Sequence, residues 1–498
     1  MWLYRLLVTV MLLMLPCACT VGPEYARPDT ALTEEGAFQG GGEGVWKCVG
    51  EDDLNRWWRR MDDPLMDGYV DVLLSENLQL KQAAARIEQA WAQLGIAQGD
   101  RVPAVAASGS GTRRMQPLES VTAASGIPIP GGGDMRFYVT RLELGLSTSW
   151  QVDLFGKIRR RIDAAKERYL ASRAEAGALV HSLIAELARR RTALATLKRR
   201  LELAEDTIAS RKLTLETVEF RYSLGGPNIT ASDIYLAREN LASVSAEVPD
   251  IQRQLFEQAY AMDVLLGYKP GTTDPMKTDI PLLPPPPKIP IALPGRLLDR
   301  RPDLQASELR MMAAVEEIGI AVADLYPDLT LSADLAFESS EANDFFQSEN
   351  LAGGILADVM MRLFEGGRLR AAIDLQKARA RELAADYAGQ VLNALREVEV
   401  ALSNERFLAE RIEKLRIRLD NIIEAEREGW NYYKRGLRPL LEVLEIQRRR
   451  YAAEQAFLLA SQAAWNNRLN LYLAIGGDWL EDEPVIRHYP LPTESGPS

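Results

Sequence analysis

The chain has 498 residues, 47% of them hydrophobic and 26% charged, which is enough apolar material for a core and excludes general disorder. The 59 Lys and Arg residues against 70 Asp and Glu residues give a net charge of −11, so the basic excess typical of nucleic-acid binding is missing and no nucleic-acid partner is expected. Two histidines and three cysteines are too few for a Cys/His zinc site, a Cys/His dyad or a disulfide framework, so we expect no metal and no cofactor.

Residues 1–18 have the features of a signal peptide: a positive charge followed by an apolar run too short for a membrane-spanning helix. Ala18 directly before Cys19 is typical of a bacterial lipoprotein processing site, in which the signal is cut before the cysteine and the new terminal cysteine is acylated. We therefore predict a covalent lipid on Cys19 and an extended, lipid-anchored segment over 19–60. Two alternatives stay open, namely acylation at Cys17 and ordinary cleavage that leaves Cys19 unmodified.

Two short motifs recur along the chain at constant offsets. Leu94-Gly95-Ile96-Ala97 recurs 224 residues later as Ile318-Gly319-Ile320-Ala321, and Gly156-Lys157-Ile158-Arg159 recurs 211 residues later as Gly367-Arg368-Leu369-Arg370. These offsets indicate two homologous halves, with extra residues in a loop of the first half. The predicted domains are repeat 1 over 61–280, a proline-rich linker over 281–298, repeat 2 over 299–480 and a C-terminal tail over 481–498.

Each half is predicted to contain a helix, two strands and a long helical hairpin. The stretch from Lys157 to Ser223 has no proline and one glycine, and the stretch 368–435 has no proline either. A helix of about 65 residues would be about 100 Å long, and its composition is typical of coiled coils. The predicted bounds are about 64–98, 102–152 and 157–267 for the helix, strands and hairpin of the first half, and about 303–325, 328–364 and 368–475 for those of the second.

The predicted strands at 141–151 and 329–338 alternate between apolar residues on one face and polar residues on the other. This alternation is typical of a barrel strand with lipid outside and water inside, and also of a half-buried strand in a soluble sandwich. No stretch beyond residue 18 reaches 18 uninterrupted apolar residues, so a membrane crossing would have to use such strands. Four strands cannot close a barrel, whereas three chains would supply twelve and leave room for water, so a trimeric pore is preferred over a filled eight-stranded dimer.

Several short motifs, each weak alone, follow one another along nearly the whole mature chain. They are Cys19-Thr20-Val21-Gly22-Pro23-Glu24-Tyr25, Trp57-Trp58 with Asp63-Pro64, Asp153-Leu154-Phe155-Gly156, Arg300-Arg301-Pro302-Asp303-Leu304, Ile318-Gly319 with Tyr326-Pro327, Leu363-Phe364-Glu365-Gly366-Gly367-Arg368, and Gly476-Gly477-Asp478-Trp479. In this order they resemble the TolC-type outer-membrane factor family, in its lipoprotein branch that serves tripartite (RND-type) efflux systems.

The resemblance implies an α+β membrane protein that forms a homotrimer. Its twelve-stranded outer-membrane β-barrel, with four strands from each chain, would continue into a long α-helical coiled-coil tunnel in the periplasm. It would be a passive exit duct for drugs, solvents or metal ions, lipid-anchored in the cell outer membrane and joined through a periplasmic adaptor (membrane fusion) protein to an inner-membrane pump. An enzyme is not expected, because no pair of acidic residues lies in a glycine-rich or histidine-bearing setting.

Two other functions stay open. The chain could be the outer-membrane channel of a type I protein secretion system, against which the predicted lipid anchor argues. It could also be a structural periplasmic lipoprotein without a pore, against which the alternating strands argue.

The resemblance also assigns positions to individual residues. Near the family's periplasmic tips, carboxylate rings or ionic links narrow the tunnel, and Asp420, Glu424 and Glu428 lie there at i, i+4 and i+8 on one helical stripe. These three are candidate gate residues, although a solvated outer face explains them too. The candidate tip residues, which would meet the adaptor or else be plain helix C-caps, are Arg221, Tyr222, Gly225, Tyr433, Arg435 and Gly436.

Overall fold

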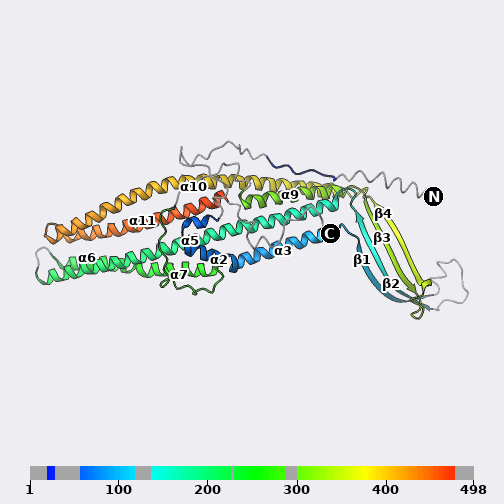
Figure 1. The fold of residues 1–498 in the computed structure, drawn as a ribbon, viewed down its shortest axis with the longest axis horizontal. Helices are drawn as coiled ribbons and strands as arrows, with labels where there is room; N and C mark the ends of the chain where they lie inside the picture. The colour runs from blue at the N-terminus through cyan, green and yellow to red at the C-terminus, as the bar shows by residue number, and fades with distance from the viewer. Residues whose placement is uncertain (1–19, 29–55, 118–135, 226–228, 287–299, 477–498) are drawn as a thin grey trace. The chain divides into compact units, whose positions relative to one another are not determined.

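The structure is a computed structural model, and it describes residues 20–28, 56–117, 136–225, 229–286 and 300–476 (Figure 1). The predicted signal peptide, Cys19, most of the segment 19–60, most of the linker and the C-terminal tail lie outside the described residues. The helices and strands are η2 (Trp57–Met61), α2 (Pro64–Glu76), α3 (Leu78–Gly99), β1 (Ala104–Pro117), β2 (Arg136–Val152), α5 (Lys157–Ser223), α6 (Ala231–Ser245), α7 (Glu247–Leu265), α9 (Pro302–Ala323), β3 (Asp328–Ser339), η4 (Ser348–Asn350), β4 (Leu351–Met360), α10 (Arg368–Lys434) and α11 (Leu440–Ile475).

The two long helices form where the sequence lacks proline. Helices α5 and α10 each run for 67 residues, which corresponds to about 100 Å at 1.5 Å per residue. Each follows a pair of strands and is followed by a returning helix, so the order of helix, two strands, long helix and returning helix occurs twice. Among the described residues, none of the helices combines the length and the apolarity that crossing a membrane requires.

Two helices that the sequence predicted as continuous are interrupted. Asn77 separates α2 from α3: its side chain accepts hydrogen bonds from the backbone of Gln79 (2.8 Å) and Leu80 (3.0 Å) and so caps α3. Its amide also donates to the Leu265 carbonyl at 2.7 Å, at the end of α7. The returning helix of the first half is divided into α6 and α7, because Pro249 has no N–H to donate four residues back, near where α6 ends.

The sheet is antiparallel, with the strand order β1-β2-β3-β4, and Figure 1 shows its strands side by side. It belongs to the first of two compact units, formed by Met1–Arg27, Gln89–Leu170 and Leu309–Ala385. Strands β2 and β3 include the alternating stretches 141–151 and 329–338, so these strand predictions are confirmed.

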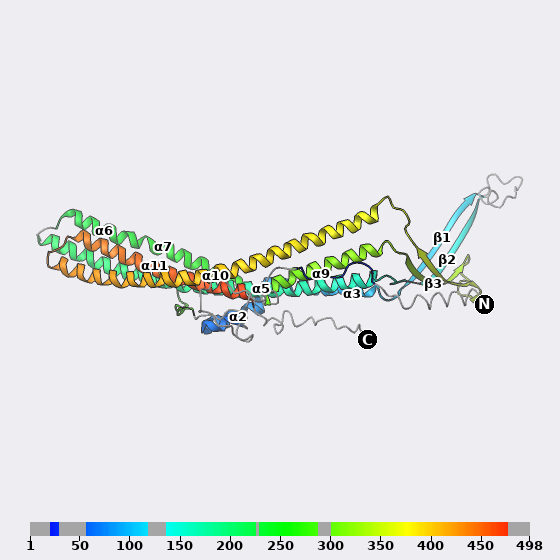
Figure 2. The same ribbon diagram turned by 90° about the horizontal axis from the view of Figure 1, so that it is seen from above.

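The second unit, formed by Pro28–Glu88, Ala171–Glu308 and Asp386–Ser498, contains the larger core. In Figure 1 and Figure 2, α6, α7 and α11 lie beside the parts of α5 and α10 that belong to this unit. Trp57 of η2 is 1% exposed and stacks on Tyr472 of α11, with the two rings 4.9 Å apart. The Trp57-Trp58 motif therefore packs η2 into the core against α11.

Candidate functional site

The sheet has one apolar face, and the strand register places its residues in rows. Val105, Thr148, Ala333 and Ile355 lie directly opposite one another across the four strands. The next apolar row consists of Ala107, Leu146, Leu335 and Gly353, and the row after it of Gly109, Leu144, Phe337 and Leu351. Ile355 is 90% exposed and Val105 is 70% exposed. Phe345 and Phe346 pack on Phe337 and cover part of the last row, but the rest of a sheet face this apolar and this exposed needs a further covering.

The opposite face of the sheet is polar and bears several acidic groups. Arg141 forms an ion pair of 2.7 Å with Glu338, and farther along the same face Ser147 lies directly opposite Asp334. At the other end of the same face, the Gln151 amide donates to Asp328 at 2.8 Å. One face is therefore suited to a hydrocarbon environment and the other to water.

Both edges of the sheet are open among the described residues. The side chains of β1 and β4 are exposed along almost their whole length, and each of these strands pairs on one side only. An unpaired strand edge presents N–H and C=O groups that can pair with another strand, so this sheet is complementary to further strands.

Each of the two long helices ends at a glycine, as the sequence predicted for the tips. Gly225 and Gly436 have φ angles of 67° and 72°, a left-handed conformation that is inexpensive only for glycine. After α10, the Gly436 N–H donates to the Tyr433 carbonyl (2.9 Å) and the Leu437 N–H to the Tyr432 carbonyl (3.0 Å), which together form a Schellman cap.

The structure brings two of the tip candidates together and leaves others exposed. The Arg221 guanidinium lies 4.9 Å from the ring centre of Tyr433, and Tyr433 is only 4% exposed, packed with Val218 in a small core of its own. Burial raises the pKa of Tyr433. Tyr433 is therefore part of the packing at the tip, whereas Tyr222 (45% exposed) and Arg435 (exposed) lie on its surface.

The three candidate gate carboxylates lie exposed on the continuous helix α10. Glu424 forms a surface ion pair with Arg427 at 2.5 Å, while Asp420 and Glu428 lie one turn away on either side. The buried acid of this stretch is Glu426, 8% exposed, and it binds Arg450 of α11 at 2.6 Å.

Sequence reasoning missed the buried ion pairs of the second unit. Arg191, fully buried, donates to Asp63 at 2.5 Å and to the Pro281 carbonyl at 2.8 Å, and so joins α5 to the start of α2 and to the proline-rich linker. Arg468 binds Glu405 through both carboxylate oxygens, at 3.0 and 2.7 Å. Their partners lie far apart in sequence, so neither pair has a local sequence signal.

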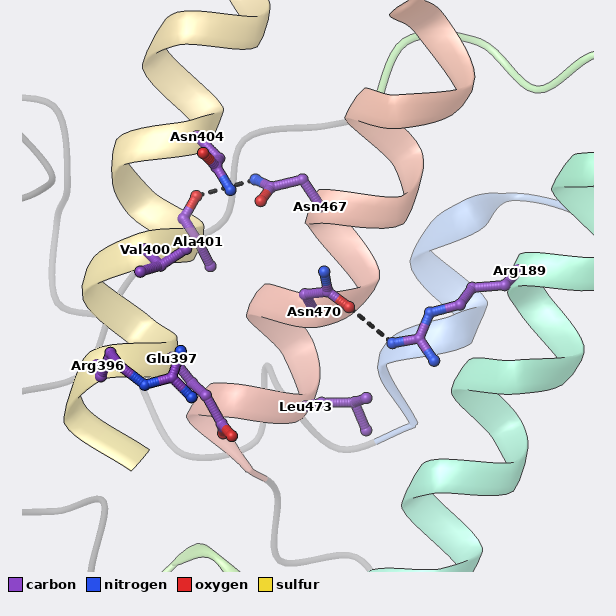
Figure 3. Close-up of a pocket in the computed structure, with 9 residues that line it drawn as sticks. All are labelled: Arg189, Arg396, Glu397, Val400, Ala401, Asn404, Asn467, Asn470 and Leu473. Atoms are coloured by element: carbon purple, nitrogen blue, oxygen red, sulfur yellow. Dashed lines mark hydrogen bonds between the residues drawn. The ribbon is translucent and has the colours of Figure 1, made fainter. Parts of the chain in front are cut away.

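A polar crevice of about 350 Å³ lies between α5, α10 and α11 (Figure 3). Across it, Arg189 donates to the Asn470 side chain at 2.6 Å, and the Asn467 amide donates to the Ala401 carbonyl at 2.9 Å. Two pairs of polar groups thus join the helices across the crevice. In the part of the chain that the structure describes, no cluster of three or more His, Cys, Asp or Glu side chains could hold a metal ion.

Comparison with known proteins places these features in context. A family model described as outer membrane efflux protein matches residues 69–268 and 293–477. The chain is 29% identical to outer membrane protein OprJ of Pseudomonas aeruginosa over 481 residues, which cover 95% of each chain. It is 26% identical over 468 residues to the probable outer membrane lipoprotein SilC of Salmonella typhimurium, covering 93% of this chain and 96% of SilC. Among solved structures, the outer-membrane channel OprN matches with a TM-score of 0.83 at 29% identity, covering 93% of this chain and 100% of OprN.

Proposed function

The chain belongs to the outer membrane efflux protein family, and from this premise we propose that three copies of it form the exit duct of a tripartite efflux pump. It is an outer-membrane efflux channel, and its fold is that of the TolC-type channels.

The sheet gives the strongest support for a trimer. It has an apolar face, a polar face and two open edges, a combination that is unstable in lipid for a single chain, because unpaired backbone groups cost several kcal/mol each there. If β4 of each copy pairs with β1 of the next copy, three copies form a closed ring of strands in which no edge is left unpaired. The resulting twelve strands enclose a water-filled interior, whereas eight would be filled by side chains.

The helices suit a water-filled tunnel. In α5 and α10 the charged residues are distributed along the whole length, and each helix is hydrophilic on average. A wall one helix thick has water on both sides, so its helices can be charged on two faces and apolar only where they meet neighbours.

The N-terminus would anchor the protein in the outer membrane through a lipid on Cys19. SilC, which matches nearly the full length of the chain, bears the name probable outer membrane lipoprotein, and this supports the anchor. The exposed tip residues Tyr222 and Arg435 would contact a periplasmic adaptor, and energy would come from the inner-membrane pump, so the duct itself needs no catalytic group.

The test is the native mass of the protein extracted from outer membranes in mild detergent, corrected for bound detergent, together with its conductance in planar lipid bilayers. We expect three chains of 55.5 kDa, less the signal peptide, and a stable conductance. A folded monomer without conductance would refute the duct and favour the structural lipoprotein. Deleting the gene in its host should raise susceptibility to small toxic molecules. Lost protein secretion with unchanged susceptibility would instead favour a type I secretion channel.

A further inference from the structure

The segment Thr20–Tyr25, which directly follows the predicted lipidation site, is bound to the first unit by specific contacts. The Val21 N–H donates to the Phe155 carbonyl at 3.2 Å, and the Arg160 Nε donates to the Val21 carbonyl at 2.7 Å. Arg160 is 4% exposed and also forms an ion pair of 2.7 Å with Glu316 of α9. A buried guanidinium with two partners fixes the segment more firmly than a surface contact would, because both of its bonds are charge-assisted and shielded from water.

Three glycines make this close approach possible. A Cβ at Gly22, where φ is 103°, would lie 2.6 Å from the Cα of Gly319 in α9. A Cβ at Gly319 would overlap the Cδ and Nε atoms of Arg160, and a Cβ at Gly156 would lie 2.6 Å from Thr20 Cγ2. We name Gly156, Arg160 and Gly319 the socket, because together they receive the segment.

Burial raises the pKa of Glu316, the acidic partner of Arg160. The Arg160 charge opposes this rise, and the charges of Asp163 and of Glu24 in the bound segment add to it. The segment therefore acts on the socket in two ways, through the Val21 carbonyl that accepts from Arg160 and through the charge of Glu24 near Glu316.

The matching place in the other half lacks a socket. By the offset of 224 residues, Gly95 is the counterpart of Gly319, yet it is exposed and a Cβ there would have no neighbour within 4 Å. By the offset of 211 residues, the counterpart of Arg160 is Ala371. Of these two related positions, only the one that receives the N-terminal segment has the arginine and the crowded glycine, so the pair is specific to that segment.

We propose that the socket holds the N-terminal segment so that the lipid anchor enters the membrane at a fixed position beside the base of the sheet. This inference rests on the proposed function, since it requires a lipid on Cys19 and a membrane-inserted sheet. Cys19 is bonded directly to Thr20, and Thr20 lies against Gly156, between the end of β2 and the start of α5.

The socket shortens the effective tether of the lipid. A free tether of six residues would let its end wander by about 13 Å, whereas a tether bound up to Thr20 leaves one Cα–Cα step of about 3.8 Å. Lipid insertion and sheet insertion are then coupled at one depth, because neither can move far along the membrane normal without the other.

The test compares Gly319→Ala with Gly95→Ala. Both changes replace a helical glycine by alanine and gain the same intrinsic helix preference, but only Gly319→Ala displaces Arg160. A nitroxide attached at Ala26→Cys, in a Cys48→Ser background, reports the mobility of the segment and its depth from accessibility to oxygen and to an aqueous nickel reagent. The full-length protein is measured in outer-membrane lipid vesicles, and Arg160→Met serves as a second variant that leaves Gly319 unchanged.

We expect an immobile label at a fixed depth in the parent protein and in Gly95→Ala. In Gly319→Ala and Arg160→Met we expect a mobile label and a broadened depth. Two results would overturn the proposal. In the first, the label in Gly319→Ala and Arg160→Met is as immobile as it is in Gly95→Ala. In the second, the label in these two variants is mobile but its depth in the membrane is unchanged. Mass spectrometry of the N-terminal peptide and the native mass of the same samples test the proposed function separately. A monomeric parent protein would refute the duct and an unacylated one would refute the lipid anchor, whereas the label mobility still reports whether the socket holds the segment.

Discussion

Leu146 lies in the central part of the apolar face of the sheet, 55% exposed and directly opposite Ala107 and Leu335. If this face contacts lipid, replacing Leu146 by Arg places a charge near the middle of the hydrocarbon layer. Ser147 is the next residue on the same strand, exposed on the polar face opposite Asp334. Leu146→Arg and Ser147→Arg therefore introduce the same side chain on opposite faces at the same depth.

The expected difference between the two variants is large. An Arg on the lipid face of a membrane barrel costs about 2–4 kcal/mol at the midplane, so three copies cost about 6–12 kcal/mol per trimer. This is comparable to the whole stability of an ordinary domain, about 5–15 kcal/mol. Ser147→Arg avoids the cost, because its guanidinium stays in water beside Asp334 and places three positive charges around the interior.

The assay is folding of the purified chain into lipid vesicles at increasing urea, followed by native electrophoresis and bilayer conductance. Leu146→Arg should fold at markedly lower urea concentrations or not form trimers at all. Ser147→Arg should form trimers normally and conduct cations less well relative to anions. Equal effects of the two variants on trimer formation, or a larger effect of Ser147→Arg, would refute the assignment of the faces.

Three further changes test the second unit. Arg191→Met should cost about 3–5 kcal/mol of unfolding free energy by leaving Asp63 buried and unpaired, and the double change with Asp63→Asn should cost less; additive costs in denaturant titration would contradict the pairing. Burial and the Glu247 interaction raise the pKa of Tyr451 to about 12. The protonated Tyr451 hydroxyl therefore makes its full contribution to the unfolding free energy below pH 10, and this contribution is lost as the pH rises through 12. Between pH 10 and pH 12 the unfolding free energy of the parent protein should fall by about 2 kcal/mol relative to that of Tyr451→Phe. Parallel pH profiles of the two unfolding free energies would disprove the raised pKa. Glu428→Gln should make cells more permeable to large antibiotics if Glu428 helps to close the tip, whereas Glu410→Gln, also exposed on α10, should not; equal susceptibility of the two strains would remove Glu428 from the gate.

The long helices and two of the strands of this protein could be predicted from local sequence patterns. The absence of proline over Lys157–Ser223 and 368–435 predicts two helices of a length that few folds contain, and both are present. The alternation at 141–151 and 329–338 predicts two strands and their apolar faces, because a strand's side-chain period is two residues. The ordered motifs identified the family, which the family model confirmed.

Other features depend on partners that are distant in sequence. The interruption at Asn77 is stabilised by the Leu265 carbonyl, 188 residues away. Likewise, Tyr433 has the appearance of a surface residue at a helix end, but the approach of Arg221, 212 residues earlier, buries it. Helical periodicity identifies the face on which a residue lies but not the element that meets that face, so these contacts required the three-dimensional structure.

The hydrogen bonds between the two helical hairpins of the second unit, α5 to α7 on one side and α10 with α11 on the other, differ in kind along α11. Nearest the tips, beyond the contact of Arg221 with Tyr433, the bonds are between neutral groups: Gln447 of α11 contacts Thr214 at 3.2 Å and Asn240 at 3.3 Å. One turn further along α11, the Tyr451 hydroxyl donates to the Glu247 carboxylate at 2.9 Å. A hydrogen bond to a charged group is about twice as strong as one between neutral groups, so the bond of Tyr451 to Glu247 is stronger than either bond of Gln447.

Within the hairpin of α10 and α11, by contrast, ion pairs join the helices at both ends. Arg450 binds Glu426 at 2.6 Å near the tip, and Arg468 binds Glu405 at 2.7 Å farther away. Both carboxylates are largely buried, and separating either pair would leave a charge without a partner in a poorly solvated place. Any separation of the two hairpins at their tips would therefore leave α10 joined to α11 by these two ion pairs.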